Sequence, residues 1–137
     1  MLNYLYVALG SAAGGLARVL AGVWLQDRLG RVMPHSGAKP FPIGTLLVNV
    51  TGSFLIGVLI VVLARRTTNA TTLHSLLVLG FCGGYTTFST FSADTLALLE
   101  SGAGPLAAMN IVASVVLALL ATLAGAALCR TLLPVRF

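Results

Sequence analysis

The sequence predicts an all-α integral membrane protein with four transmembrane helices, and two observations lead to this fold class. First, the 137 residues are 58% hydrophobic and only 8% charged, whereas a soluble domain carries about 25% charged residues. Second, four apolar runs follow one another with short connections, and one membrane span needs about 20 apolar residues. Residues 1–137 therefore form a single four-helix membrane domain with no room for a soluble one.

The first two spans are bounded by charged and turn-forming residues. The first span, residues 2–25, contains a single charged residue, Arg18, and Trp24 lies where an aromatic side chain would anchor its end at the interface. A loop rich in Pro, Gly and basic residues follows. The second span, residues 43–64, has no charge and ends at Arg65-Arg66.

The last two spans are bounded in the same way. The third, residues 73–99, carries Asp94 and is followed by Glu100-Ser101-Gly102. Pro105 opens the fourth, residues 105–128, because proline is well tolerated in the first turn of a helix.

The middle of the third span is poorly suited to a continuous helix. Gly83-Gly84 is followed by Thr or Ser at five of the next eight positions; Gly costs about 1 kcal/mol relative to Ala, and the hydroxyl groups compete for backbone hydrogen bonds. We therefore expect a break near residues 83–87, whose freed carbonyl groups would suit a hard cation such as Na⁺. Phe88 and Phe91 then share one face of the following half-helix, and their electropositive ring edges could contact a small anion.

Two polar stripes lie along the other spans. Thr45, Asn49 and Ser53 recur at every fourth position of the second span, and the fourth span places Asn110, Ser114 and Thr122 on one face, with Ala118 in the gap. Hydrogen bonding between helices accounts for many such stripes. The alternative is a path for an anion, since these neutral groups can all donate; a proton relay would need carboxylates or histidines.

Small residues and Arg18 complete the first span. Gly10 and Gly14 form a small-xxx-small pair within a run of Gly, Ala and Ser, which favours close helix packing. Arg18 either snorkels to the interface or caps a neighbouring helix, which we favour, or contacts an ion.

The basic residues leave the orientation in the membrane open. One face would hold Arg65, Arg66, Arg130 and Arg136, and the other Arg28, Arg31 and Lys39. Four against three is almost no bias under the positive-inside rule. Either the termini weakly prefer the cytoplasm, or the chain inserts both ways and forms an antiparallel homodimer. The same spread of charge excludes a nucleic-acid-binding patch.

These motifs resemble those of a known family. The run Gly80-Phe-Cys-Gly-Gly-Tyr-Thr-Thr-Phe-Ser-Thr-Phe-Ser92 is similar to the third-helix signature of the Fluc/CrcB bacterial fluoride channels. The resemblance extends to residues 14–18, 44–53 and 110–122, in the same order and spacing.

The resemblance implies a fluoride-selective channel that passively exports F⁻ and relieves fluoride toxicity. Family members are multi-pass proteins of the bacterial cytoplasmic (inner) membrane and assemble as dual-topology antiparallel homodimers with two pores. By position, the carbonyl groups of Gly83 and Thr86 from both subunits would hold a central structural Na⁺, and Arg18 would match the structural arginine of the first helix. The fluoride pore would be lined by Asn49, Phe88, Thr90, Phe91, Asn110, Ser114 and Thr122.

The sequence also departs from the family pattern at three positions. Asn110 lies where some members have Tyr, Ala118 replaces a hydroxyl residue, and Asp94 lies where many members have Glu. The polar track of the fourth helix is therefore thinner here.

Three other classes of function fit the sequence less well. A small four-helix multidrug/proton antiporter needs a carboxylate within its first helix, but no Asp or Glu precedes Asp27. A non-transporting assembly subunit would leave the Gly/Thr break and its Phe pair unexplained. An enzyme is disfavoured because the two His and three acidic residues show no pairing at catalytic spacing.

Overall fold

The computed structural model describes residues 2–36, 39–65 and 68–132. Four helical spans within these ranges are long and apolar enough to cross a membrane, which confirms the four predicted spans. They are α1 (Leu2–Leu29), α2 (Ile43–Ala64), a composite third span (Ala70–Glu100) and α6 (Gly104–Leu132). Arg66 and Arg136, which entered the charge count, lie outside the described residues.

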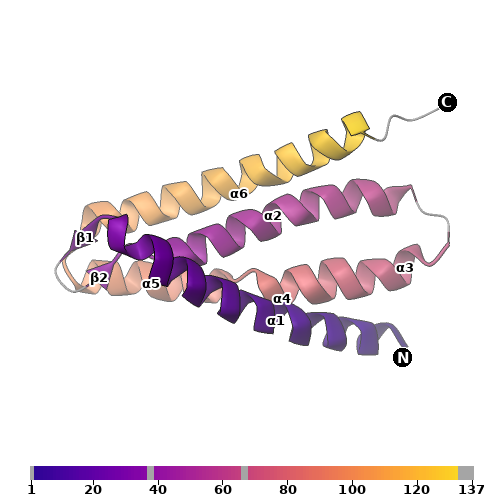
Figure 1. The fold of residues 1–137 in the computed structure, drawn as a ribbon, viewed down its shortest axis with the longest axis horizontal. Coiled ribbons are helices and arrows are strands. Elements are labelled where there is room, and N and C mark those ends of the chain that lie inside the picture. The colour runs from indigo at the N-terminus through magenta and orange to yellow at the C-terminus, as the bar shows by residue number, and fades with distance from the viewer. Residues whose placement is uncertain (1, 37–38, 66–67, 133–137) are drawn as a thin grey trace.

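The spans lie side by side and alternate in direction. Figure 1 shows the start of α1, the end of α2, the start of α3 and the end of α6 at one end of the molecule. The hairpin between α1 and α2 and the turn between α5 and α6 lie at the opposite end. This up-and-down order follows from the short connections between spans.

The first and last helices are longer than their apolar runs. The sequence indicates ends at residues 25 and 128, whereas α1 continues to Leu29 and α6 to Leu132. The added turns carry the charged residues Asp27, Arg28 and Arg130. Charged side chains end the apolar run but not the helix, because at the interface they reach water while the backbone bonds continue.

The third span is made of four consecutive helical pieces. These are α3 (Ala70–Leu73), the π-helix η2 (His74–Cys82), α4 (Gly83–Tyr85) and α5 (Phe88–Glu100). Nothing in the apolar pattern distinguishes the wider π-helical turns from α-helical ones, so the sequence did not predict η2. Between α4 and α5, Thr86 and Thr87 are extended, with φ/ψ of −83°/156° and −150°/117°.

A small hairpin connects α1 to α2. It consists of η1 (Gly30–Val32) and two short antiparallel strands, β1 (His35–Ser36) and β2 (Lys39–Pro40). Gln26 of α1 ties this connection down: its Nε2 donates to Phe41 O at 3.1 Å, and its Oε1 accepts from Gly44 N at 3.0 Å. The second contact satisfies one of the amides at the start of α2 that have no partner within the helix.

The turn between α5 and α6 is as tight as the Glu100-Ser101-Gly102 sequence predicts. Gly102 has φ +77°, a left-handed conformation that glycine adopts at little cost. The Ala103 amide donates back to Leu98 O at 2.9 Å, which closes the end of α5. Leu98, Ala103 and Ala107 are buried together beneath this turn.

Glycines allow the spans to pack backbone against backbone. A Cβ atom on Gly10 or Gly14 of α1 would lie 2.1 Å from Leu76 O or Phe81 O of η2, so the predicted packing role of this pair is confirmed. At the α2–α6 crossing, a Cβ on Gly57 would lie 2.1 Å from Thr122 O. The hydrophobic effect does not drive helix association in lipid, so close backbone packing of this kind holds the spans together.

Candidate functional site

Two adjacent threonines produce the interruption of the third span. The Thr86 amide and its Oγ1 both donate to Cys82 O at 2.9 Å, which completes the last turn of α4. Thr87 is the N-cap of α5, because its Oγ1 accepts from the Thr90 amide at 3.1 Å. One hydroxyl therefore ends a half-helix and the next begins another, and Thr90 contributes to the second cap.

Asn49 of α2 occupies the break. Its Nδ2 donates to Thr87 O at 3.0 Å, and its Oδ1 accepts from the Thr87 amide at 2.8 Å. Thr87 is buried, so both of its main-chain groups need these partners. The sequence placed Asn49 on a polar stripe with Thr45, and the structure brings both side chains to the third span, at Thr87 and Asp94.

The aromatic pair lies directly after the break. The ring centroids of Phe88 and Phe91 are 5.3 Å apart and the rings are tilted by 53°. Phe91 is 8% exposed, whereas Phe88 is 76% exposed on the outer surface of the chain. One ring of the pair is thus buried, and the other is exposed.

A buried chain of hydrogen bonds connects α6 to Phe91. Ser114 Oγ donates to Asn110 Oδ1 at 3.4 Å, and Asn110 Nδ2 donates to Thr95 Oγ1 at 2.9 Å. Thr95 Oγ1 in turn donates to Phe91 O at 2.8 Å. The sequence singled out Asn110, Ser114 and Phe91, and the structure brings them together.

Thr95 is the residue that sequence reasoning missed. It is 8% exposed and links the fourth-span stripe to the backbone of α5. A signal was present, because Thr95 lies four residues after Phe91 and so shares its helix face. Its single hydroxyl did not stand out in a span that contains several.

Thr122 lies apart from this chain. Its Oγ1 donates to Ser53 O and to Ala118 O, both at 3.1 Å. The first contact joins α6 to α2 beside Gly57, and the second lies within α6. Thr122 therefore joins two helices and does not extend the Asn110–Ser114 chain.

A cavity of about 510 Å³ opens beside the break, between α1, the hairpin, α2 and α5. Arg18, Lys39 and Asp94 are the ionisable residues that line it. Thr45 Oγ1 donates to Asp94 Oδ2 at 2.7 Å. Thr87 and Thr90 form part of the same wall, so the cavity reaches the break. The predicted Arg18 therefore lies on a cavity that contains charged groups.

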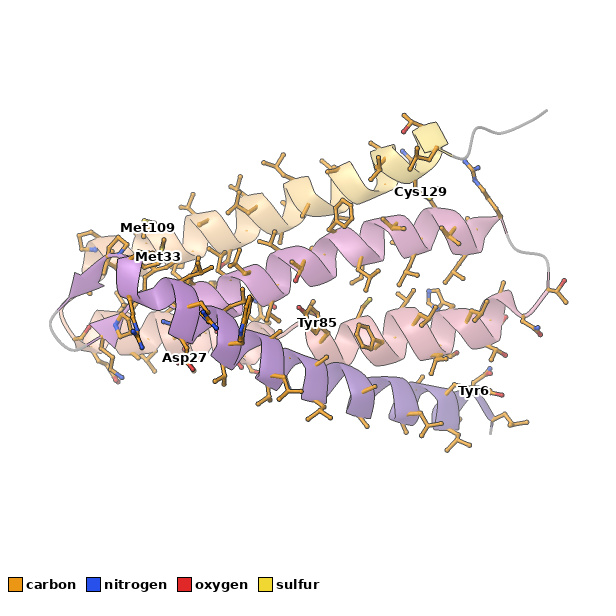
Figure 2. All side chains as sticks on the ribbon, in the orientation of Figure 1. Tyr6, Asp27, Met33, Tyr85, Met109 and Cys129 are labelled. Atoms are coloured by element: carbon orange, nitrogen blue, oxygen red, sulfur yellow. The ribbon has the colours of Figure 1, made fainter. Side chains whose placement is uncertain are left out.

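Figure 2 shows how another side chain supports the break. Tyr85, the last residue of α4, lies between the third span and α2. Its hydroxyl is 3.1 Å from Thr51 Oγ1, and its ring stacks on Phe81 with centroids 5.8 Å apart. Gly52 allows α2 to lie close to the break, because a Cβ atom at this position would lie 2.4 Å from Thr86 Cγ2.

Main-chain oxygens are the groups at the break that could hold a cation. In a continuous helix the Thr87 amide would donate to Gly83 O, but here it donates to Asn49 Oδ1. Gly83 is exposed on the surface of the chain. Among the residues that the structure describes, no group of three or more His, Cys, Asp or Glu side chains could bind a metal.

Comparison with known proteins identifies the family. Residues 5–126 match the family model described as "CrcB-like protein, Camphor Resistance (CrcB)". The chain is 46% identical over 132 residues to the fluoride-specific ion channel FluC of Agrobacterium fabrum, which covers 96% of this chain and 99% of that protein. It is 44% identical over 132 residues to the FluC of Rhizobium meliloti, with the same coverage.

A longer relative also matches. The chain is 47% identical over 131 residues to the FluC of Methylococcus capsulatus, which covers 96% of this chain and 54% of that protein. The chain thus spans about half the length of this relative and nearly the whole length of the other two. The family match covers most of the chain, including all four spans, and the chain belongs to the CrcB-like family.

Proposed function

We propose that this protein is a fluoride-selective channel that passively exports F⁻ and limits its toxicity. The observation that carries the proposal is the break at Thr86-Thr87, where a Phe pair lies directly after a gap in the helix and a cavity lined by Arg18 and Lys39 reaches the same point. Relatives that share 46% and 44% of their residues with this chain carry the name fluoride-specific ion channel. The proposed activity is transport, not catalysis.

The proposed ion path begins in the cavity. Arg18 and Lys39 would raise the local concentration of anions at its mouth. Fluoride would then exchange water for hydroxyl donors such as Thr90 and for the ring edges of Phe88 and Phe91. Such donors suit a small, strongly hydrated anion, because chloride would gain less from each hydrogen bond.

Asn110, Ser114 and Thr122 belong to the proposed path in different ways. Asn110 and Ser114 form the buried chain that ends at Phe91 O, so they would set the position of the ring as well as offer donors. Thr122 is engaged at the α2–α6 crossing and would need to leave one of its carbonyl partners to contact an ion.

A structural Na⁺ at the break fits the residues that are present. The carbonyl groups of Gly83 and Thr86 would hold it, since hard cations prefer oxygen ligands and broken membrane helices offer them. The diverted Thr87 amide and the exposed position of Gly83 support this assignment. The ion would supply fixed positive charge at mid-membrane.

The proposed assembly is an antiparallel homodimer in the bacterial cytoplasmic (inner) membrane. Phe88, exposed to 76% on the protomer, would be covered by a second copy. The near-even division of basic residues between the two faces permits insertion in both orientations. The partners are thus a second copy of the chain, fluoride and the lipid bilayer.

A multidrug/proton antiporter is not favoured by the structure. Such a transporter needs a membrane-embedded carboxylate in α1. Asp27 is exposed in the last turn of that helix, and Figure 2 shows it at the hairpin end of the bundle. No other acidic residue lies on the described part of α1.

Anion flux from liposomes tests the channel proposal. Protein reconstituted with internal fluoride should release F⁻ at least ~100-fold faster than Cl⁻, because the path exchanges water for donors matched to a small anion. Phe88→Ile and Phe91→Ile should each lower fluoride release while the protein still elutes as a dimer. Equal release of both ions, or none, would reject the channel. If fluoride flux were unchanged in both variants, the two rings would not be part of the ion path.

A further inference from the structure

Thr87 lies in the extended segment between α4 and α5. The residue is 7% exposed. A buried amide or carbonyl without a partner destabilises a protein, so both main-chain groups of Thr87 need one. Within the described residues both partners come from one side chain, Asn49.

The carboxamide of Asn49 matches this requirement because it carries a donor and an acceptor at the same time. Aspartate would offer only acceptors and would repel Thr87 O. Alanine would leave both main-chain groups without partners. The two contacts, at 3.0 Å and 2.8 Å, close a ring that fixes the plane of the amide relative to the Thr87 backbone.

Two consequences follow from this ring. First, the Thr87 amide donates to Asn49 Oδ1 and not to Gly83 O, its acceptor in a continuous helix. Second, Thr87 is held where its Oγ1 caps the Thr90 amide, which sets the start of α5 and the position of Phe88.

We propose that Asn49 is a positioning residue: its carboxamide holds Thr87 extended between α4 and α5 and thereby sets the place of the Phe88–Phe91 pair. The effect of Asn49 on the ion is exerted through the backbone of the third span. The consequence for ion selectivity rests on the proposed channel function, whereas the clamp on Thr87 does not.

Hydrogen–deuterium exchange of the full chain in nanodiscs, in buffer without fluoride, tests the clamp directly. In Asn49→Ala, peptides that cover residues 83–92 should exchange about tenfold faster, because the loss of two hydrogen bonds costs more than 1.4 kcal/mol. Asn49→Asp keeps the acceptor for the Thr87 amide and should give a smaller increase. Ser53→Ala, one turn further along the same stripe, is the matched control and should leave exchange in this segment unchanged.

Flux measurements on the same variants separate positioning from direct contact. We expect Asn49→Ala to lower the F⁻/Cl⁻ permeability ratio together with the faster exchange. Slower fluoride flux with unchanged exchange would mean that Asn49 acts only on the ion, and would overturn the proposal. If the unmodified protein passed no fluoride, the channel function would fail, while the exchange result would still decide the clamp. If Asn49→Ala failed to fold, Asn49→Asp would carry both measurements.

Discussion

At the scale of single residues, the hydroxyl and amide side chains of this protein form most of their hydrogen bonds with backbone groups. Thr86 and Thr87 end and begin half-helices, and Asn49 satisfies the Thr87 backbone. In lipid no water is present to perform these tasks, so a break in a helix needs side chains of this type. The polar side chains at the break therefore have a structural role.

Thr95 offers a residue-scale prediction on stability. Thr95→Val keeps the shape of the side chain but removes the hydroxyl that accepts from Asn110 Nδ2. The free energy of unfolding should fall by about 1–2 kcal/mol, because a buried amide donor loses its partner. Unfolding by denaturant in detergent micelles measures this change.

Thr95→Ser is the matched control for this prediction. It keeps the hydroxyl and should retain most of the stability, apart from the loss of one methyl group. Equal destabilisation by Val and Ser would show that packing, and not the hydrogen bond to Asn110, is what matters at this position.

At the scale of elements, glycine positions decide how the spans fit together. The run of small residues in the first span predicts close packing without saying which glycine faces which helix. In the structure Gly14 lies against Phe81 O, whereas a Cβ on Gly15 would meet nothing within 4 Å. Neighbouring residues on a helix point about 100° apart, so only one of them can face the third span.

At this scale, we predict that alanine substitutions at Gly14 and Gly15 differ in their effect on stability. Gly14→Ala should destabilise the protein by about 1–3 kcal/mol, because the new methyl group would be forced into the backbone of η2. Gly15→Ala should be neutral or stabilise the helix by up to about 1 kcal/mol. Thermal unfolding of both variants in detergent tests this, and similar losses for both would contradict the packing of α1 on η2.

At the scale of the whole molecule, the fold of a single chain leaves polar and aromatic groups of the break uncovered. Phe88 and Gly83 are exposed beside Thr86 and Thr87, in the middle of a span that must cross lipid. The outward faces of α1 and α6 are apolar and suit lipid. An antiparallel second copy would cover the break without needing a further protein.

Orientation in the membrane is the prediction at this scale. Ser101 lies in the exposed turn between α5 and α6, and both native cysteines, Cys82 and Cys129, are buried. In a background without these two cysteines, Ser101→Cys should be labelled in intact cells to roughly half the extent seen in lysed cells. Complete labelling, or none, before lysis would indicate a single orientation and reject the dual-topology dimer.

The fold class and the residue types of the candidate site can be predicted from the sequence. The four spans follow from apolar length, and a poor helix near residues 83–87 follows from the adjacent glycines and hydroxyl residues. The π-helical turns of η2 and the role of Thr95 do not follow, because periodicity reports which face is apolar and not which partner meets it.

The sequence by itself determined that this chain crosses the membrane four times, that its third span is weak at Gly83–Thr87, and that neutral donors and two Phe lie near that point. Only the tertiary structure decided that Asn49 meets Thr87, that Asn110 reaches Phe91 through Thr95, and that Arg18 and Asp94 share one cavity. The physical reason is that span length and helix propensity are local properties. Hydrogen-bond partners depend instead on how glycine contacts set the rotation and depth of each helix against its neighbours.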